Sequence, residues 1–470
     1  KVLSYPTKNH PYITVQPGMF YRDFEKITLE NDLILPCYTA SKSLNTLGGM
    51  YGNNSAGERT LKYGNTEKHV VSSKVVFSNG GEYFIKSLNS SELKEKISSN
   101  TFEGNIYKNI FEMLKNNKEI IERAKPKVHK NSAGYYLWNI EENIKEEKYF
   151  NFNKLLVGSQ GTLGMATEIT FKLVPDLKHS KLVVIFIKDL EPLGRLVDEI
   201  LIAKPETLES YDDKTIKLAT RFFFDFLKNK GIINMVKFMW SFLPEFAMFL
   251  RGGFPNLVIL AEFAGENERE VNKKCLNLIN KIKEFKLETR ITKSEAEANK
   301  YWDIRRESFA LLRKHVKGKH TAPFIDDIIV RPEFLPKFLP KLNKILSDYD
   351  IIFTLAGHAG DGNFHIIPLM DFKHEDTTDI IIELSERVYS LVAEFKGSNA
   401  AEHNDGIIRT PYLEKMFSAE ILKLFKNVKN LFDPQNIFNP GKKVPTEHCG
   451  GTKEYIREHV ALEHDIVHGS

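Results

Sequence analysis

Two histidines bracket a tight turn in the C-terminal half of the 470-residue chain, where residues 357–365 read Gly-His-Ala-Gly-Asp-Gly-Asn-Phe-His. His358 and His365 can converge on one point if the end of one strand faces the start of the next across this turn. Neutral imidazoles are the commonest protein ligands for zinc-like metals. A lone histidine is usually structural, but this pair is followed by Glu402 and His403, which favours a metal-binding function.

Two further segments are rich in glycine. Residues 46–57 read Thr-Leu-Gly-Gly-Met-Tyr-Gly-Asn-Asn-Ser-Ala-Gly, and residues 158–169 read Gly-Ser-Gln-Gly-Thr-Leu-Gly-Met-Ala-Thr-Glu-Ile. Without Cβ atoms, backbone N–H groups can approach an anion or a flat ring closely. Taken singly, each segment also fits an ordinary surface loop or turn. Neither has the Rossmann or the Walker spacing.

The elements that must position these residues change in character along the chain. Residues 1–178 hold short β-type runs and glycine turns, with strands expected at 12–15, 70–77 and 170–174 and a helical segment at about 105–124. From residue 179 strands alternate with helices; strands are expected at 182–187, 257–263, 351–355 and 364–369, and helices at 193–201 and 381–395. This pattern predicts an α+β sandwich, here a sheet covered by helices on one face.

Composition excludes several classes of protein. The 66 basic and 62 acidic residues are interspersed, so nucleic-acid binding is not expected. The three cysteines are far apart, which argues against a disulfide framework or an iron–sulfur motif and favours a reducing cytoplasm. The chain contains no run of 18 apolar residues, so we expect no membrane-spanning helix. The aromatic segment 222–250 fits either a helix pair at a membrane surface or, as we favour, core packing within an insertion.

Taken together, the motifs resemble a known family. The pattern TLGGxxxNNSAG, followed by GSQGTLGMATEIT, resembles the FAD-binding fold of the vanillyl-alcohol-oxidase flavoprotein superfamily. HxGDGNxH with a later acidic–histidine pair resembles the C-terminal domain of its D-lactate, glycolate and 2-hydroxyglutarate dehydrogenases. Residues 432–442 resemble that family's closing FDPxxxxNPGK, where the chain returns to the flavin domain. The resemblance covers about residues 12–445.

The resemblance implies a domain plan. We expect an α+β protein with an FAD-binding domain at 1–178 and a return to that domain at 401–445, followed by a tail at 446–470. Residues 179–400 would form an α+β cap domain that has an antiparallel sheet covered by helices and carries the metal motif. The family begins with another glycine-rich loop, which we do not find before Pro17. We therefore expect an N-terminally truncated FAD-binding domain that holds FAD weakly.

The resemblance also implies roles for individual residues. His358, His365 and Glu402 would ligate the metal, His403 would be the general base, Arg305 would bind the substrate carboxylate, and Asn363 would lie near the substrate. A solvated helix arginine is the alternative for Arg305. The residues expected to bind flavin are Thr46, Gly48, Gly49, Asn53, Ala56, Gly57, Tyr63, Gly64, Gly158, Ser159, Gly161, Thr162, Gly164, Ile169 and Asn439.

Two positions depart from the family pattern. Gln160 stands where glutamate is usual, a change that we expect to be tolerated. Asn404 stands where glycine is usual, and its side chain beside the predicted base puts the shape of the substrate pocket and the choice of substrate in question.

The implied function is an FAD-dependent and metal-dependent dehydrogenase, with zinc, manganese or iron as the metal. It would oxidise a small 2-hydroxy acid to the 2-keto acid, with D-lactate first and glycolate or D-2-hydroxyglutarate next. Electrons would pass to a quinone, a cytochrome or an iron–sulfur protein, in the cytoplasm or peripherally at the inner face of the membrane. The alternatives are a metal-dependent hydrolase, which leaves both glycine-rich segments unused, and a catalytically incomplete flavoprotein fragment.

Overall fold

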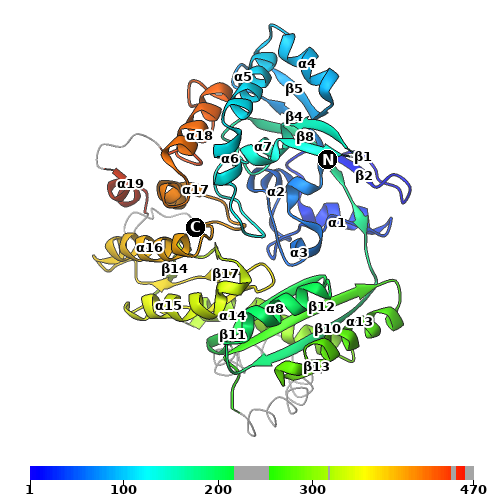
Figure 1. The fold of residues 1–470 in the computed structure, drawn as a ribbon, viewed down its shortest axis with the longest axis vertical. Coiled ribbons are helices and arrows are strands. Elements are labelled where there is room, and N and C mark those ends of the chain that lie inside the picture. The colour runs from blue at the N-terminus through cyan, green and yellow to red at the C-terminus, as the bar shows by residue number, and fades with distance from the viewer. Residues whose placement is uncertain (145, 216–252, 316–317, 446–450, 461–470) are drawn as a thin grey trace. The chain divides into compact units, whose positions relative to one another are not determined.

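The computed structural model describes residues 1–470 except 145, 216–252, 316–317, 446–450 and 461–470 (Figure 1). The chain divides into two compact units. The first unit contains Lys1–Asp176 and Lys396–His459, and the second is built on Leu177–Phe395. The chain thus leaves the first unit at residue 176 and returns at 396, close to the sequence-based boundaries at 178 and 400. The aromatic segment 222–250 lies outside the described residues.

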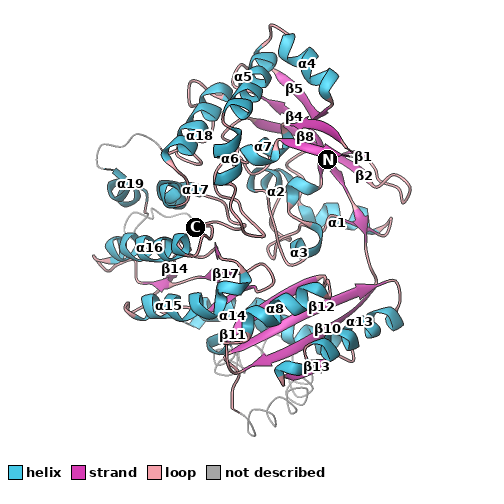
Figure 2. Ribbon diagram, viewed as in Figure 1, coloured by secondary structure: helices cyan, strands magenta, loops and turns pink. Residues whose placement is uncertain are grey.

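The first unit is organised by a seven-stranded antiparallel sheet (Figure 2). Its strands, in spatial order, are β1 (Val2–Ser4), β2 (Tyr12–Val15), β8 (Met165–Lys172), β4 (Val70–Val76), β5 (Glu82–Leu88), β7 (Glu147–Asn151) and β6 (Glu141–Ile144). A small second sheet pairs β3 (Leu33–Ile34) with β9 (Val174–Pro175). The strands expected at 12–15 and 70–77 are confirmed as β2 and β4. The expected strand at 170–174 covers only the end of β8 and the start of β9.

The first unit also contains helices. They are α1 (Tyr21–Leu29), α2 (Leu47–Asn53), α3 (Thr60–Tyr63), α4 (Ser90–Ser98), α5 (Phe102–Asn116), α6 (Lys118–Ala124), α7 (Asn153–Leu156), α17 (Gly406–Arg409), α18 (Ala419–Phe432) and α19 (Gly451–His459). Helix α4 begins at a capping box formed by Asn89 and Glu92. Phe432 of α18 packs edge-on against Phe77, with ring centroids 5.2 Å apart, so the C-terminal segment is part of the first unit's core.

The second unit contains another seven-stranded antiparallel sheet. Its spatial order is β13 (Glu288–Ile291), β10 (His179–Ile187), β12 (Leu257–Gly265), β11 (Thr207–Asp212), β16 (Leu355–His358), β17 (Asn363–Ile366) and β15 (Ile328–Ile329). A small sheet pairs β14 (His320–Thr321) with β18 (Leu369–Met370). Its helices are α8 (Leu193–Ile202), α13 (Glu268–Lys281), α14 (Glu295–His315), α15 (Leu335–Ser347) and α16 (Thr377–Glu394).

Two strand predictions for this unit are confirmed, as β10 and β12, and the other two have wrong boundaries. The strand expected at 351–355 overlaps the observed strand β16 only at Leu355. β16 begins there because its register is set by the histidine turn. Ile352 makes only an isolated bridge to Leu369. The strand expected at 364–369 divides into β17 and β18, because Pro368 between them lacks the N–H that a continuous ladder requires.

Both faces of the second unit's sheet are covered. Leu182, Val184 and Phe186 of β10 face a cluster that includes Tyr301 and Trp302 of α14. The alternate residues of β10 point to the opposite face and are also buried, so cover on one face only, as the sequence suggested, is wrong. Helix α13 packs against β10 and β12. Among the described residues, no helix has both the length and the apolar character needed to cross a bilayer.

Candidate functional site

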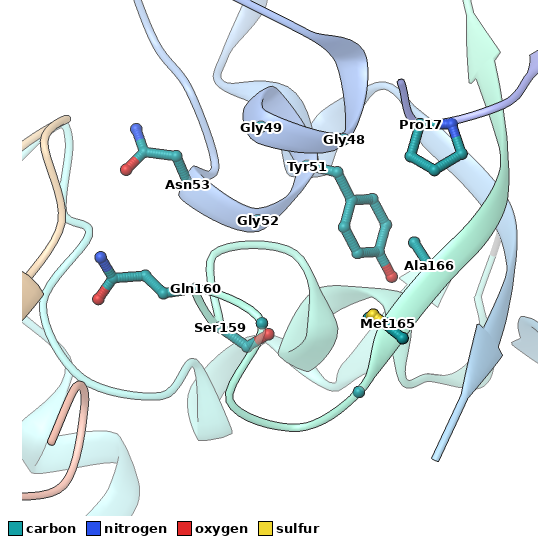
Figure 3. A pocket seen from close by; sticks show the side chains of 12 residues that line it. Pro17, Gly48, Gly49, Tyr51, Gly52, Asn53, Ser159, Gln160, Met165 and Ala166 are labelled. Atoms are coloured by element: carbon teal, nitrogen blue, oxygen red, sulfur yellow. The ribbon is translucent and has the colours of Figure 1, made fainter. Parts of the chain in front are cut away.

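The two glycine-rich segments meet in the first unit. The N–H of Gly158 donates to the carbonyl of Tyr51 at 2.9 Å, and the N–H of Gln160 donates to that of Gly52 at 2.8 Å. Between the segments lies a cavity of about 440 Å³ (Figure 3). Its lining consists of Pro17, Gly48, Gly49, Tyr51, Gly52, Asn53, Ser159, Gln160, Gly161, Gly164, Met165 and Ala166.

Glycine keeps this cavity open. A Cβ built on Gly161 would meet no atom within 4 Å, and one built on Gly52 would meet only the backbone nitrogen of Gly161, at 4.0 Å. Side chains at these positions would therefore occupy the space that the cavity offers. Gly161 also has φ +67°, which favours glycine. Glycine thus exposes backbone along part of the cavity wall, and this suits a flat, anionic cofactor such as FAD.

The cavity has chemically different ends. In Figure 3 the polar side chains of Asn53 and Gln160 lie at one end, and Pro17, Met165 and Ala166 lie at the other. Tyr51 is buried in the wall, and its hydroxyl shares a 3.1 Å hydrogen bond with Ser73. Burial raises the pKa of the Tyr51 hydroxyl, so that it stays protonated.

Some of the predicted flavin-binding residues line the cavity, and others support it. The lining contains Gly48, Gly49, Asn53, Ser159, Gly161 and Gly164. Asn439 lies outside the lining but donates to the carbonyl of Gln160 at 2.7 Å. Also outside the lining are Thr46, Ala56, Gly57, Tyr63, Gly64, Gly158, Thr162 and Ile169.

Sequence reasoning missed other lining residues. Tyr51, Gly52, Gln160, Met165 and Ala166 lie within the same two motifs, so the motifs themselves were the available signal. Pro17 lies outside both. It belongs to the lining because Gly48 packs directly on it: a Cβ on Gly48 would lie 2.6 Å from the Cβ of Pro17.

The segment 402–406 is hydrogen-bonded to both glycine-rich segments. Asn53 donates its side-chain amide to the carbonyl of Glu402 at 2.8 Å. Asn404 donates its own amide back to the carbonyl of Asn53 at 3.1 Å and to that of Gly158 at 3.0 Å. Asn404 has φ +65°, a conformation that asparagine tolerates better than most residues. Its side chain therefore faces the glycine-rich segments.

Charged groups are buried around the same segment. Lys130 Nζ lies 2.5 Å from a carboxylate oxygen of Glu402, with 2% and 7% of the two side chains exposed. Lys443 Nζ lies 3.0 Å from a carboxylate oxygen of Asp405. Burial lowers the pKa of Lys443, while the nearby Asp405 opposes that shift. His403, the predicted base, is exposed.

The histidine turn lies in the second unit and is a hairpin between β16 and β17. His358 pairs with Asn363 in the strand register, and the N–H of Asp361 donates to the carbonyl of His358 at 3.0 Å. Gly362 has φ +75°, and a Cβ there would lie 1.9 Å from the carbonyl oxygen of Val330. Only glycine fits this position. The hairpin holds the rings of His358 and His365 with centroids 5.3 Å apart.

Each of the two imidazoles is anchored through Nδ1. His358 Nδ1 lies 2.5 Å from a carboxylate oxygen of Glu209, and His365 Nδ1 lies 3.0 Å from the carbonyl oxygen of Asp326. A carbonyl or carboxylate oxygen accepts the Nδ1 proton, so Nε2 is the nitrogen that would ligate an ion. The ring nitrogens of His358 and His365 that could ligate an ion lie within 4.8 Å of one another. The donor set and its anchoring fit a divalent metal.

Asn363 and Arg305 are also held in the second unit. Asn363 donates its amide to Asp327 Oδ1 at 3.0 Å and to the carbonyl of Ile328 at 3.1 Å. Among the described residues, its buried Oδ1 has no hydrogen-bond partner, so it is able to accept a hydrogen bond from a ligand. The guanidinium of Arg305 contacts Glu209, and only 8% of the Arg305 side chain is exposed. That burial contradicts the alternative of a solvated helix arginine.

Two family models match the chain. Residues 177–443 match the family model described as the C-terminal domain of FAD linked oxidases, and residues 5–84 match the FAD binding domain. The chain is 25% identical over 437 residues to a D-2-hydroxyglutarate dehydrogenase of Pseudomonas putida, covering 92% of this chain and 41% of that protein. It thus spans about two fifths of the length of that relative.

Two other matches extend the comparison. The glycolate oxidase subunit GlcD of Bacillus subtilis is 28% identical over 432 residues, which cover 91% of this chain and 74% of that protein. The solved structure of p-cresol methylhydroxylase with substrate bound matches with a TM-score of 0.62 and 14% identity, covering 95% of this chain and 79% of that one. The structural match indicates a shared fold.

Proposed function

Because the chain belongs to the family of FAD-linked oxidases, we propose that it oxidises a small 2-hydroxy acid to the 2-keto acid. FAD would occupy the cavity between the two glycine-rich segments. A divalent metal would bind His358, His365 and Glu402, the ligands predicted from the sequence. The candidate substrates are D-lactate, glycolate and D-2-hydroxyglutarate, with D-lactate first.

The observation that carries this proposal is the anchored histidine pair. Both Nδ1 atoms are bonded to oxygen acceptors, so both histidines present the same nitrogen as a ligand. A purely structural pair would not need this common tautomer. The unpartnered Oδ1 of Asn363, in the strand position opposite His358, supports a ligand at the same hairpin.

The protein's own groups would have separate tasks. The guanidinium of Arg305 would bind the substrate carboxylate, and Asn363 Oδ1 would accept a hydrogen bond from the substrate. His403 would take the proton of the α-hydroxyl as general base. A bound divalent ion would supply Lewis-acid polarisation of that hydroxyl. Bound FAD would supply the two-electron redox chemistry, accepting the α-hydrogen as hydride.

Anaerobic reduction of the bound flavin tests the proposal without an electron acceptor. The protein is loaded with FAD and Zn²⁺ or Mn²⁺ and mixed with each of the three acids, and with L-lactate as the control. One of the three acids should bleach the visible flavin absorbance. His403→Ala should retain flavin and metal but bleach roughly 10²–10⁴-fold more slowly. Flavin that stays oxidised with all three acids would refute the proposed substrate class.

A second assay addresses the electron acceptor. After reduction by substrate, the flavin should be reoxidised by a quinone, a cytochrome or an iron–sulfur protein, and the rates would rank these classes. A metal-dependent hydrolase would leave the cavity between the glycine-rich segments without a role. It would also show turnover that does not depend on FAD, which the same FAD-free and FAD-loaded samples would reveal.

A further inference from the structure

Glu209 is a buried carboxylate that the sequence motifs did not identify. It lies on β11, which pairs with β16 so that Ser210 faces Gly357. One step further along the two antiparallel strands, Glu209 lies beside His358. Its side chain is 1% exposed. Burying a lone carboxylate is costly, so its partners must compensate its charge.

Those partners are on different elements. One carboxylate oxygen of Glu209 lies 2.5 Å from His358 Nδ1, and the other contacts the guanidinium of Arg305. The side chains of His358 and Arg305 are 6% and 8% exposed, so water screens neither contact strongly. The three groups form a buried row, arginine to carboxylate to imidazole, within the second unit.

We propose that Glu209 is the positioning residue of the metal centre, a role that rests on the metal site of the proposed function. An ionised carboxylate can only accept hydrogen bonds, so it fixes the His358 proton on Nδ1 and leaves Nε2 to face an ion. The Arg305 guanidinium holds the second carboxylate oxygen and prevents the carboxylate from turning. Glu209 thereby also connects the predicted carboxylate-binding arginine to a metal ligand.

Glutamine at this position separates the positioning role from simple packing. Its side chain has the same shape, but one end is an amide that only donates. If the glutamine oxygen accepts from His358, the glutamine NH2 group faces the N–H donors of Arg305. In the reverse orientation, the NH2 group faces the Nδ1–H donor of His358. Glu209→Gln should therefore misorient the imidazole while preserving the volume. Glu209→Asp keeps the charge on a shorter side chain and should recover part of the function.

The assay is the affinity for Co²⁺, measured by competition with a chelator and by the cobalt absorption spectrum. Glu209→Gln should weaken Co²⁺ binding about 10- to 100-fold and alter the spectrum. Glu206→Gln is the matched control: Glu206 is also buried but lies three residues earlier, just before β11 begins at Thr207. It should bind Co²⁺ like the parent protein.

The outcomes distinguish the two proposals. If His358→Ala loses Co²⁺ but Glu209→Gln binds it with parental affinity and spectrum, the role of Glu209 is wrong and the metal site stands. If the parent protein does not bind Co²⁺, the metal site itself is wrong. Should Glu209→Gln fail to fold, nitrogen NMR of the zinc-loaded parent protein with labelled histidine decides. It should show His358 protonated at Nδ1, and a proton on Nε2 would overturn the inference.

Discussion

Replacement of Asn404 tests how the flavin cavity is held together. Its side chain makes three hydrogen bonds: to the carbonyls of Asn53 and Gly158, and from the N–H of Asp405 at 2.8 Å. At roughly 0.5–1.5 kcal/mol each, their loss in Asn404→Ala should cost about 1.5–4.5 kcal/mol. Alanine also keeps the Cβ that disfavours the left-handed backbone found here, a strain of about 1 kcal/mol, without the local hydrogen bonding by which asparagine tolerates it.

Two further variants separate the hydrogen bonds from the backbone strain. Asn404→Gly loses the same bonds without the strain, so it should be about 1 kcal/mol more stable than Asn404→Ala. Asn404→Asp keeps the shape but turns a carboxylate oxygen toward two carbonyls, so it should be at least as harmful as alanine. Urea unfolding of FAD-loaded protein, followed by flavin fluorescence, gives the free energies. Parental stability in all three variants, or alanine above glycine, would refute this reasoning.

Two other predictions follow from the cavity and from a buried acid. Gly52→Val should place its side chain in the flavin cavity and abolish FAD retention with an unchanged circular dichroism spectrum; a yellow variant would contradict this. Burial raises the pKa of Asp212 to about 6, so its contribution to stability is fully present below about pH 4 and is lost as the pH rises through 6. Asp212→Asn should therefore stabilise the protein by about 2–3 kcal/mol above pH 6 and change little at pH 4 in calorimetry, whereas an equal effect at both pH values would exclude this cause.

The parts of the fold that the sequence predicts well are those with strong local patterns. Continuous apolar runs predict β10 and β12, because a strand buried on both faces is apolar at successive positions. Apolar residues at helical spacing predict α16, because one stripe of the helix is buried. The boundaries around the histidine turn were less predictable. The start of β16 depends on pairing with β11 and β17, which apolar residues at 351–353 do not reveal.

The candidate site shows the same division. The glycine-rich segments and the histidine hairpin could be identified because glycine at such density has few other uses. Glu209 and Lys130 could not, because each is brought to its partner by strand pairing or chain return over 149 and 272 residues. An isolated glutamate in a buried strand and a lysine before an ordinary turn carry no local signal. Their importance lies in compensating buried charge, which only tertiary structure specifies.

The two departures from the family pattern meet at one place. Asn404, where glycine is usual, donates to the carbonyl of Gly158, and Gln160, where glutamate is usual, accepts from the N–H of Gly406 at 3.1 Å. Both residues have positive φ. Asp405 lies between the two contacts, buried and already paired with Lys443. A glutamate at 160 would add a second carboxylate next to Asp405, whereas the neutral glutamine accepts the same hydrogen bond without that repulsion. Gln160 and Asn404 thus act as a neutral pair that joins the second glycine-rich segment to the residues following Glu402 and His403.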